Sequence, residues 1–305
     1  MQIRHALLTL PIAMSAACAG SPSQASHAAP AITKAEAQQV LSRYEATGNQ
    51  AGKALDARLL SSVETGAQLS MDTAAFKLRR ATSQQSKPLA YTAPVFYIPR
   101  ATGYPRWFAV DAASGTTHNA LLFSQDAAGD PWRLAADPYS KGNPLTDVQL
   151  DSDGYATIAK PARPVGAAHA ALLTDGPSAP AASGLEPGTL TSRAYAALLQ
   201  AQSGFLKLGV RLVSHFAPGA EPVYALQTKD GGSVVWYTLR QRESYITSRP
   251  GTISVAGDLV GLGPSGKVHK QLDTVVLVQY LAQVPNHGDT KVTATYRKAI
   301  QATAS

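Results

Sequence analysis

The sequence predicts an α+β protein in which helices precede a curved antiparallel sheet, and it predicts that this order occurs twice. Three observations lead to this class. Apolar residues recur at helical spacing between residues 33 and 82, and from residue 89 they follow a strand-like pattern. The same succession returns after residue 190. A segment rich in proline and glycine separates the two halves.

The first helix is expected to begin at a capping box formed by Thr33 and Glu36. In this motif the threonine side chain accepts a hydrogen bond from the third helical N–H, and the glutamate accepts one from the threonine N–H. Gly48 is expected to end the helix. The spacing of apolar residues predicts two more helices, over residues 53–63 and 72–82.

Strands separated by glycine-containing turns follow these helices. A short helix over residues 165–173 is expected to end the first half. A helix that begins at residue 191 or 192 opens the second half and is expected to continue through Val213. The Asp-Gly-Gly sequence at 230–232 indicates a hairpin. The predicted strands span residues 89–98, 106–110, 119–124, 132–136, 222–228, 232–246, 252–260, 273–284 and 291–302.

These elements suggest two folded domains behind an export segment. Residues 18–31 are small and polar and show no periodicity, which is typical of a flexible tether. Six of the fourteen residues from 175 to 188 are proline or glycine, which is typical of a linker. We therefore predict a signal peptide over 1–17, a tether over 18–31, a first α+β domain over 32–176, a linker over 177–189 and a second α+β domain over 190–305.

The first eighteen residues have the order of a secretory signal. Arg4 supplies positive charge, an apolar run follows to Met14, and small residues precede Cys18. The apolar run is shorter than the roughly 20 residues that a membrane-spanning helix needs. The small residues before Cys18 resemble the lipobox of bacterial lipoproteins, although Ser15 stands where that motif usually has leucine. This resemblance implies that Cys18 is acylated and becomes the new N-terminus.

Cys18 is the only cysteine in the chain, so an internal disulfide cannot form. Acylation would remove a free thiol that is a liability outside the cell. The alternative is ordinary signal-peptidase cleavage after Ala17, Ala19 or Ala25, which leaves Cys18 free or removes it. Acyl chains would hold the protein to the extracytoplasmic face of the cell membrane, because each buried CH₂ contributes about 0.8 kcal/mol.

The formal charge of +7 is a modest excess, since charged residues make up only 15% of the chain. It suits a surface that meets anionic lipid head groups or envelope polymers, or it serves solubility alone. The basic residues are scattered, which excludes a nucleic-acid-binding stripe. The expected partners are therefore the membrane, through Cys18, and an anionic envelope polymer or another envelope protein.

Two motifs resemble ligand sites but depart from them. Gly261 to Lys267 has the glycine spacing of a phosphate loop, yet Val268 replaces the required Ser or Thr and a strand follows. We predict a hairpin loop there. Asp151 to Gly154 resembles the start of a calcium loop, but alanine occupies its sixth and twelfth positions, so a polar turn is expected. No two histidines lie four residues apart and no G-x-S-x-G motif occurs, so neither a metal nor a cofactor is expected.

Basic and aromatic residues cluster at Arg100, Tyr104, Arg106 and Trp107. Arginine supplies charge and an aromatic ring supplies a flat face, so this group is a candidate surface for contact with an anionic polymer. The alternative is a hairpin strand in which Trp107 and Phe108 lie on opposite faces of the sheet.

Several segments resemble a group of secreted actinobacterial lipoproteins that has no assigned activity. The resemblance is carried by TKAEAQQVLSRYE at 33–45, by Glu64-Thr-Gly, by Tyr97-Ile-Pro-Arg and by Tyr104-Pro-Arg-Trp-Phe. The order of three helices and a meander also resembles the cone-shaped fold of ketosteroid isomerase and nuclear transport factor 2. That likeness is architectural and transfers no catalytic residue.

These observations favour a membrane-anchored, non-catalytic binding or scaffold lipoprotein of the cell envelope. The alternative is an enzyme that uses the interior of the cone as an apolar pocket. Its acid or base would be a buried carboxyl group with a raised pKa, and the candidates are Asp111 and Glu64.

Overall fold

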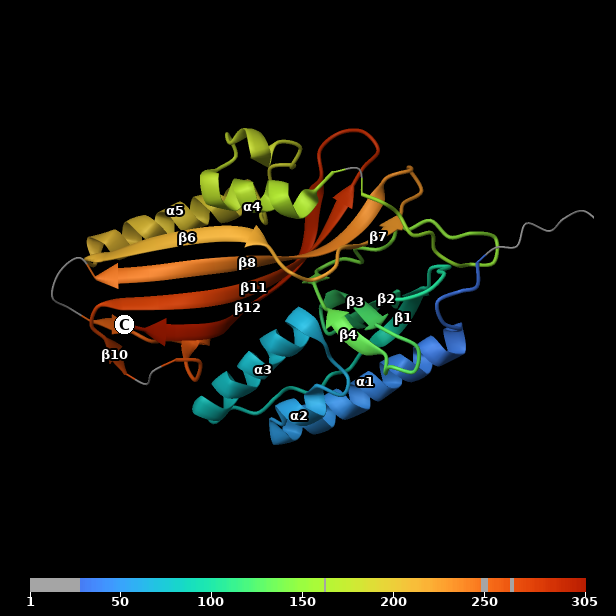
Figure 1. The fold of residues 1–305 in the computed structure, drawn as a ribbon, viewed down its shortest axis with the longest axis horizontal. Helices are drawn as coiled ribbons and strands as arrows, with labels where there is room; N and C mark the ends of the chain where they lie inside the picture. The colour runs from blue at the N-terminus through green and yellow to red at the C-terminus, as the bar shows by residue number, and fades with distance from the viewer. Residues whose placement is uncertain (1–27, 162, 248–251, 264–265) are drawn as a thin grey trace, which may run out of the picture.

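The chain forms one ten-stranded antiparallel sheet with helices packed on both faces (Figure 1). The computed structural model describes residues 28–161, 163–247, 252–263 and 266–305. The predicted α+β class is confirmed. Within the described residues no helix is both long and apolar enough to cross a bilayer.

The helices are α1 (Lys34–Ala54), α2 (Ala57–Leu60), α3 (Gly66–Ala81), α4 (Val165–Asp175) and α5 (Ser192–Lys207), with short 3-10 helices η1 (Pro180–Ala182) and η2 (Gly257–Leu259). The strands are β1 (Thr92–Tyr97), β2 (Arg106–Ser114), β3 (Thr117–Gln125), β4 (Arg133–Ala136), β5 (Tyr139–Ser140), β6 (Val210–Pro218), β7 (Tyr224–Gln227), β8 (Ser233–Thr247), β9 (Ile253–Ser254), β10 (Lys267–Val268), β11 (Gln271–Val284) and β12 (Lys291–Ala304).

The main sheet has the strand order β1-β2-β3-β5-β12-β11-β8-β6, with β4 beside β3 and β7 beside β8. Strands β9 and β10 form a separate two-stranded ribbon. The strands of the first half therefore occupy one end of the sheet, and the long strands of the second half occupy the other (Figure 1).

Strand β5 joins these two groups of strands. Its Tyr139 pairs with Asn119 of β3 on one side and with Thr295 of β12 on the other. A side chain strengthens the junction, because Gln279 of β11 accepts a hydrogen bond from the Asp137 N–H at 2.9 Å and donates one to the Ala135 carbonyl at 3.1 Å. The end of β4 and the start of β5 are thus fixed to the long strands.

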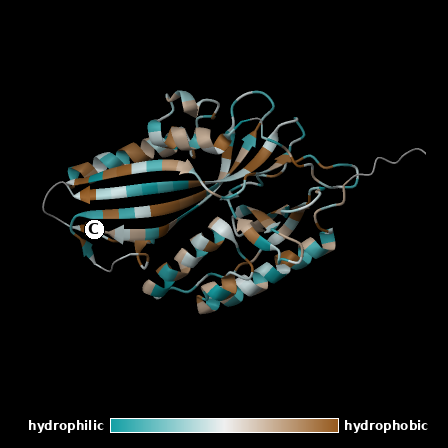
Figure 2. Ribbon diagram, viewed as in Figure 1, coloured by the Kyte–Doolittle hydropathy of each residue, from teal (hydrophilic) through white to brown (hydrophobic). Residues whose placement is uncertain are grey.

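Helices can pack on both faces of the sheet because successive side chains of a strand point to opposite faces. On β11, Val276, Val278 and Tyr280 belong to the apolar cluster that packs under α4. The intervening Leu277 instead packs against Ala67 and Met71 of α3. Figure 2 shows apolar and polar residues interleaved along the long strands, and on β6 the residues alternate between buried and exposed, as expected where one face of the sheet meets solvent.

Helix α1 begins at the predicted capping box. The Thr33 side chain accepts a hydrogen bond from the Glu36 N–H at 3.2 Å, and the Glu36 carboxylate accepts one from the Thr33 N–H at 3.0 Å. Ala37, Leu41 and Tyr44 are buried against the sheet of the first half, in one cluster with Phe108 and Phe123. The helical spacing read from the sequence is confirmed by this packing.

Several predicted boundaries are wrong, and tertiary packing explains them. Helix α1 continues past Gly48 to Ala54, with Gly48 buried beneath Leu89. Helix α3 starts six residues before the predicted residue 72, because Ala67 and Met71 bury against β12 and β11.

The predicted continuation of the α5 helix to Val213 is also wrong. The helix ends at Lys207, and strand β6 begins at Val210, after Gly209 turns the chain with a φ of 78°. Residues of β6 alternate between buried and exposed, and Leu212 and Phe216 point inward. The apolar residues that suggested a longer helix therefore have the two-residue period of a strand. The hairpin predicted at 230–232 is confirmed, since it joins β7 to β8.

The predicted linker lies against the folded protein. Ala182 and Leu185 are buried in the cluster under α4, and Leu185 bridges to Thr290. Both halves contribute strands to one sheet. The division into domains at 177–189 stays a prediction, as does the likeness to a cone-shaped fold.

The glycines of the phosphate-loop-like motif allow close backbone packing. Strands β9 and β10, on either side of the motif's glycines, pair antiparallel, which agrees with the predicted hairpin, although residues 264 and 265 of the motif lie outside the described residues. A Cβ atom on Gly261 would lie 2.7 Å from the carbonyl oxygen of Lys77 in α3. A Cβ atom on Gly263 would lie 2.8 Å from the carbonyl oxygen of Ala302 in β12. These glycines therefore seat the loop against α3 and β12.

Replacing Thr33 with alanine is expected to lower the free energy of unfolding by about 1 kcal/mol, because the first turn of α1 loses its side-chain cap. Chemical denaturation measures the change. Thr65→Ala is the matched control, since Thr65 precedes α3 without a side-chain capping bond. Equal losses in the two variants would contradict a specific role for the cap.

Candidate functional site

A recess of about 760 Å³ lies where the first three helices meet the junction of the sheet. Its walls come from α1, α2 and α3, from the segment 85–91, and from residues of β3, β5 and β12. This volume falls within the roughly 300–1,000 Å³ that is typical of small-molecule sites. We call this feature the recess, and we call its inner part, formed by Glu64, Gln68, Asp72, Asn119 and Asp137, the floor.

Two carboxyl groups of the floor come from the helical layer. Glu64 is 1% exposed and accepts a hydrogen bond from the Tyr44 hydroxyl at 3.3 Å. Asp72 on α3 accepts one from the Tyr296 hydroxyl of β12 at 2.6 Å and one from the Gln68 amide at 2.8 Å. Asp72 is thus held between the side-chain amide of Gln68, on the same helix, and a tyrosine from the far end of the chain.

The third carboxyl group comes from the junction of the sheet. Asp137, just before β5, accepts a hydrogen bond from the Asn119 amide at 2.7 Å and one from the Tyr91 hydroxyl at 3.4 Å. Its backbone N–H donates to Gln279. The carboxyl group is therefore held by both its side chain and its backbone, and it keeps partial exposure toward the recess.

Three acceptor oxygens of the floor have no hydrogen-bond partner among the described residues. They are Oε2 of Glu64, Oε1 of Gln68 and Oδ1 of Asn119, whose residues are 1%, 1% and 7% exposed. The Ser86 hydroxyl in the wall of the recess is also unpartnered. A buried polar group without a partner costs about 1–3 kcal/mol, so a ligand that donates hydrogen bonds would be favoured here.

Two carboxyl groups of the floor, those of Glu64 and Asp137, bind protons more tightly than exposed ones. Burial raises the pKa of Asp137 to about 7; the Asn119 hydrogen bond opposes the rise, and the nearby Asp72 carboxylate adds to it. Burial, followed by repulsion from Asp72, raises the pKa of Glu64 well above its usual value of 4.5. The floor therefore takes up protons at pH values where exposed carboxyl groups are ionised.

The outer part of the recess carries the opposite charge. Lys53, Arg79 and Lys87 line it, and none of them forms an ion pair with another described residue. We call these three residues the rim. The rim is cationic and the floor is acidic, so a bound molecule would meet two different chemical environments along its length.

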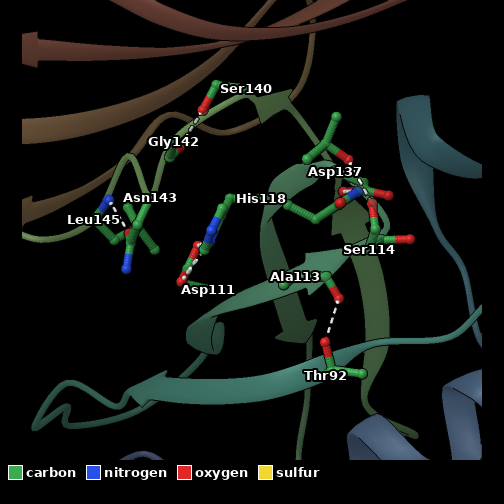
Figure 3. A network of polar contacts seen from close by, with 12 residues as sticks. Thr92, Asp111, Ala113, Ser114, His118, Asp137, Ser140, Gly142, Asn143 and Leu145 are labelled. Carbon is green, nitrogen blue, oxygen red and sulfur yellow. Dashed lines mark hydrogen bonds and ion pairs between the residues drawn. The ribbon is translucent and has the colours of Figure 1, made fainter.

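Of the two predicted acid or base candidates, only Glu64 lies in the recess. Asp111 on β2 pairs with His118 on β3, with 3.1 Å between its Oδ1 and the His118 Nδ1. His118 and Asn119 are consecutive in β3, so their side chains leave opposite faces of the sheet. Figure 3 shows the Asp111–His118 pair and, apart from it, Asp137. The predicted interior was apolar, whereas the floor of the recess is polar.

Two of the four predicted contact residues, Arg100 and Trp107, are engaged by other residues of the protein. The Arg100 guanidinium bonds Asp151 at 2.8 Å and also pairs with Asp153, so the polar turn predicted at 151–154 binds this arginine. Trp107 is 5% exposed and packs against Tyr224. Trp107 is therefore not open for contact, whereas a contact role of Arg100, whose side chain stays 18% exposed, remains a prediction.

The reason for the burial of Trp107 is that both faces of β2 are covered. The predicted arrangement with Trp107 and Phe108 on opposite faces is correct, but neither face meets solvent, since Phe108 is also buried. Tyr104 remains exposed, and the Arg106 guanidinium lies 5.0 Å from its ring centre. A contact surface formed by Tyr104 and Arg106 stays a prediction.

The acylation of Cys18 stays a prediction, because Cys18 lies outside the described residues. Among the residues that the structure describes, no group of three or more His, Cys, Asp or Glu is arranged to hold a metal ion.

Most of the floor carries no recognisable signal in the sequence. Asp72 and its partner Tyr296 are 224 residues apart, and Asp137 and Gln279 are 142 apart. Only the folded sheet brings these residues together. An isolated aspartate between two short strands gives no periodicity or motif that could have identified Asp137.

Comparisons with known proteins place the chain in a family of unknown function, and its matched relatives are lipoproteins. A family model described as a domain of unknown function, DUF8094, matches residues 28–304. An uncharacterized lipoprotein of Streptomyces coelicolor is 27% identical over 86% of this chain and 83% of its own length. A second lipoprotein of that species is 30% identical over 77% of each chain, and one of Streptomyces avermitilis is 28% identical over 74% of this chain and 71% of its own. No solved structure matches the chain.

Asp137 is expected to contribute a fall in the free energy of unfolding as the pH rises from about 4 to about 7. The folded protein holds the Asp137 proton with a pKa of about 7, whereas the ordinary value is 3.8, so this carboxyl group binds more protons in the folded state over this interval. Buried His169, whose pKa is lowered to about 4, contributes with the opposite sign. In chemical denaturation at several pH values, Asp137→Asn should therefore make the free energy of unfolding increase more with pH, or decrease less, than in the wild type. Asp175→Asn, at an exposed position, is the control and should leave the slope unchanged.

Proposed function

Because the chain belongs to the DUF8094 family, whose matched Streptomyces relatives are lipoproteins, we propose that it is a lipid-anchored binding protein of the cell envelope. Cys18 carries the acyl chains, and the folded part stands on the extracytoplasmic face of the cell membrane. The tether predicted over residues 18–31 ends before Ala29, because Ala29 and Ala31 form backbone hydrogen bonds with Ala101 and Pro99 of the folded part. The recess binds the ligand.

The single observation that carries the binding role is the set of unpartnered acceptors in the floor. Glu64, Gln68 and Asn119 line a recess of ligand size, and each carries a buried oxygen without a protein partner. A protein with no use for the recess would gain stability by replacing these groups with apolar ones. Their presence supports a ligand that donates hydrogen bonds.

A catalytic role is the second candidate, and the pKa values favour it. Two carboxyl groups in one recess, Glu64 and Asp137, have raised pKa values, which is the property that a general acid or base requires. In that case Glu64→Gln would retain the ligand but abolish its turnover. The loss of binding together with turnover would favour the non-catalytic role.

Cys18→Ala is expected to abolish acylation and to release the protein from the membrane fraction. Cells that express each form are fed an alkyne-tagged fatty acid, and the label on the purified protein is measured. Ser21→Ala, three residues away in the tether, is the control and should retain the label. Equal labelling of Cys18→Ala, or its full retention in the membrane fraction, would contradict anchoring by this residue.

The purified full-length protein in detergent is expected to unfold at a higher temperature when a low-molecular-mass extract of the envelope is added, because a ligand of the folded state stabilises it. Gln68→Leu should abolish most of this shift. Gln200→Leu, on the exposed surface of α5, is the matched control. An extract that leaves the wild-type midpoint unchanged would contradict the binding role.

A further inference from the structure

We propose that the ligand of the recess is an acidic carbohydrate, whose hydroxyl groups bind the acceptors of the floor and whose anionic group binds the rim. The anionic group is a carboxylate or a phosphate on a polyhydroxylated molecule. This inference rests on the proposed binding function and specifies its ligand class.

The floor selects for donors because two of its three unpartnered atoms can only accept hydrogen bonds, and the third, on Glu64, accepts them when its carboxyl group is ionised. The free oxygens of Gln68 and Asn119 are amide carbonyls, and that of Glu64 belongs to a carboxyl group. Two kinds of ligand group supply several donors close together, namely the hydroxyl groups of a sugar and the ammonium groups of a polyamine. Neither an aliphatic chain nor a bare anion satisfies these oxygens.

The rim distinguishes between the two kinds of donor. A polyamine would have to pass Lys53, Arg79 and Lys87, and like charges brought together cost free energy. An anionic group on a sugar would instead form charge-assisted hydrogen bonds there, which are about twice as strong as neutral ones. The raised pKa values of Glu64 and Asp137 point the same way, since protonation weakens the attraction of the floor for a cation.

The wall between floor and rim offers an aromatic surface. Tyr139 of β5 lines the recess with 43% of its surface exposed, and its ring centre lies 6.1 Å from that of Tyr296. A tyrosine ring presents an apolar face beside a polar hydroxyl group. The C–H face of a sugar ring can pack against such a surface while the hydroxyl groups at its edge reach the floor.

The test uses isothermal titration calorimetry on the purified full-length protein in detergent, with five probes. Trigalacturonic acid and glucose 6-phosphate represent carboxylated and phosphorylated sugars. Maltotriose is a neutral sugar, tricarballylate is an anion without hydroxyl groups, and spermidine is a polyamine. We expect at least one of the two acidic sugars to bind at least tenfold more tightly than each of the other three probes.

Variants then show which residues of the recess bind the anionic end of the ligand and which bind its hydroxyl groups. Arg79→Ala combined with Lys87→Ala should weaken the binding of the acidic sugar about tenfold and leave that of maltotriose unchanged. Gln68→Leu should weaken both. Lys207→Ala, at the exposed end of α5, is the control for a loss of positive charge elsewhere.

Three results would overturn the inference. Spermidine as the tightest probe would assign the recess to cations, and equal affinity for maltotriose and trigalacturonic acid would remove the role of the rim. If no sugar binds while the envelope extract still stabilises the protein, the ligand class is wrong although the binding function stands. If the extract also has no effect, the binding function itself fails.

Discussion

The pairing of β5 between β3 and β12 is the constraint on which the rest of the structure depends. This two-residue strand is the only direct link between the two groups of strands in the main sheet of the described chain. It sets where the helices of the first half meet the long strands of the second. The same junction assembles the floor of the recess. Asp137 directly precedes β5, and Asn119 of β3 pairs with Tyr139 of β5. Tyr296, which holds Asp72, follows the β12 residue that pairs with Tyr139.

The recess concentrates charge that the composition of the chain does not reveal. Charged residues are sparse overall, yet three carboxyl groups share one floor and three cations share its rim. Burial raises the pKa values of Glu64 and Asp137, and tyrosine and amide groups hold the carboxyl groups in place. Such an arrangement costs folding stability, which supports a functional reason for it.

Local signals in the sequence predicted local structure well. The capping box of α1, the Asp-Gly-Gly hairpin and the polar turn at 151–154 depend on residues within a few positions of one another, and all three are present. Boundaries that depend on packing were predicted wrongly, as at Gly48 and after Lys207. Glu64 was identified as a candidate acid, but its neighbours in the floor were not, because no spacing along the chain relates Asp72 to Asp137.

The sequence by itself determined the α+β class, the starts of several elements and the chemistry expected at Cys18. These features follow from short-range rules, in which hydrogen bonds, side-chain period and charge order act over a few residues. The tertiary structure alone decided that Trp107 is buried, that Arg100 forms ion pairs with Asp151 and Asp153, and that one recess combines an acidic floor with a cationic rim. The reason is physical: burial and electrostatic environment depend on neighbours in space, and here those neighbours lie up to 224 residues apart.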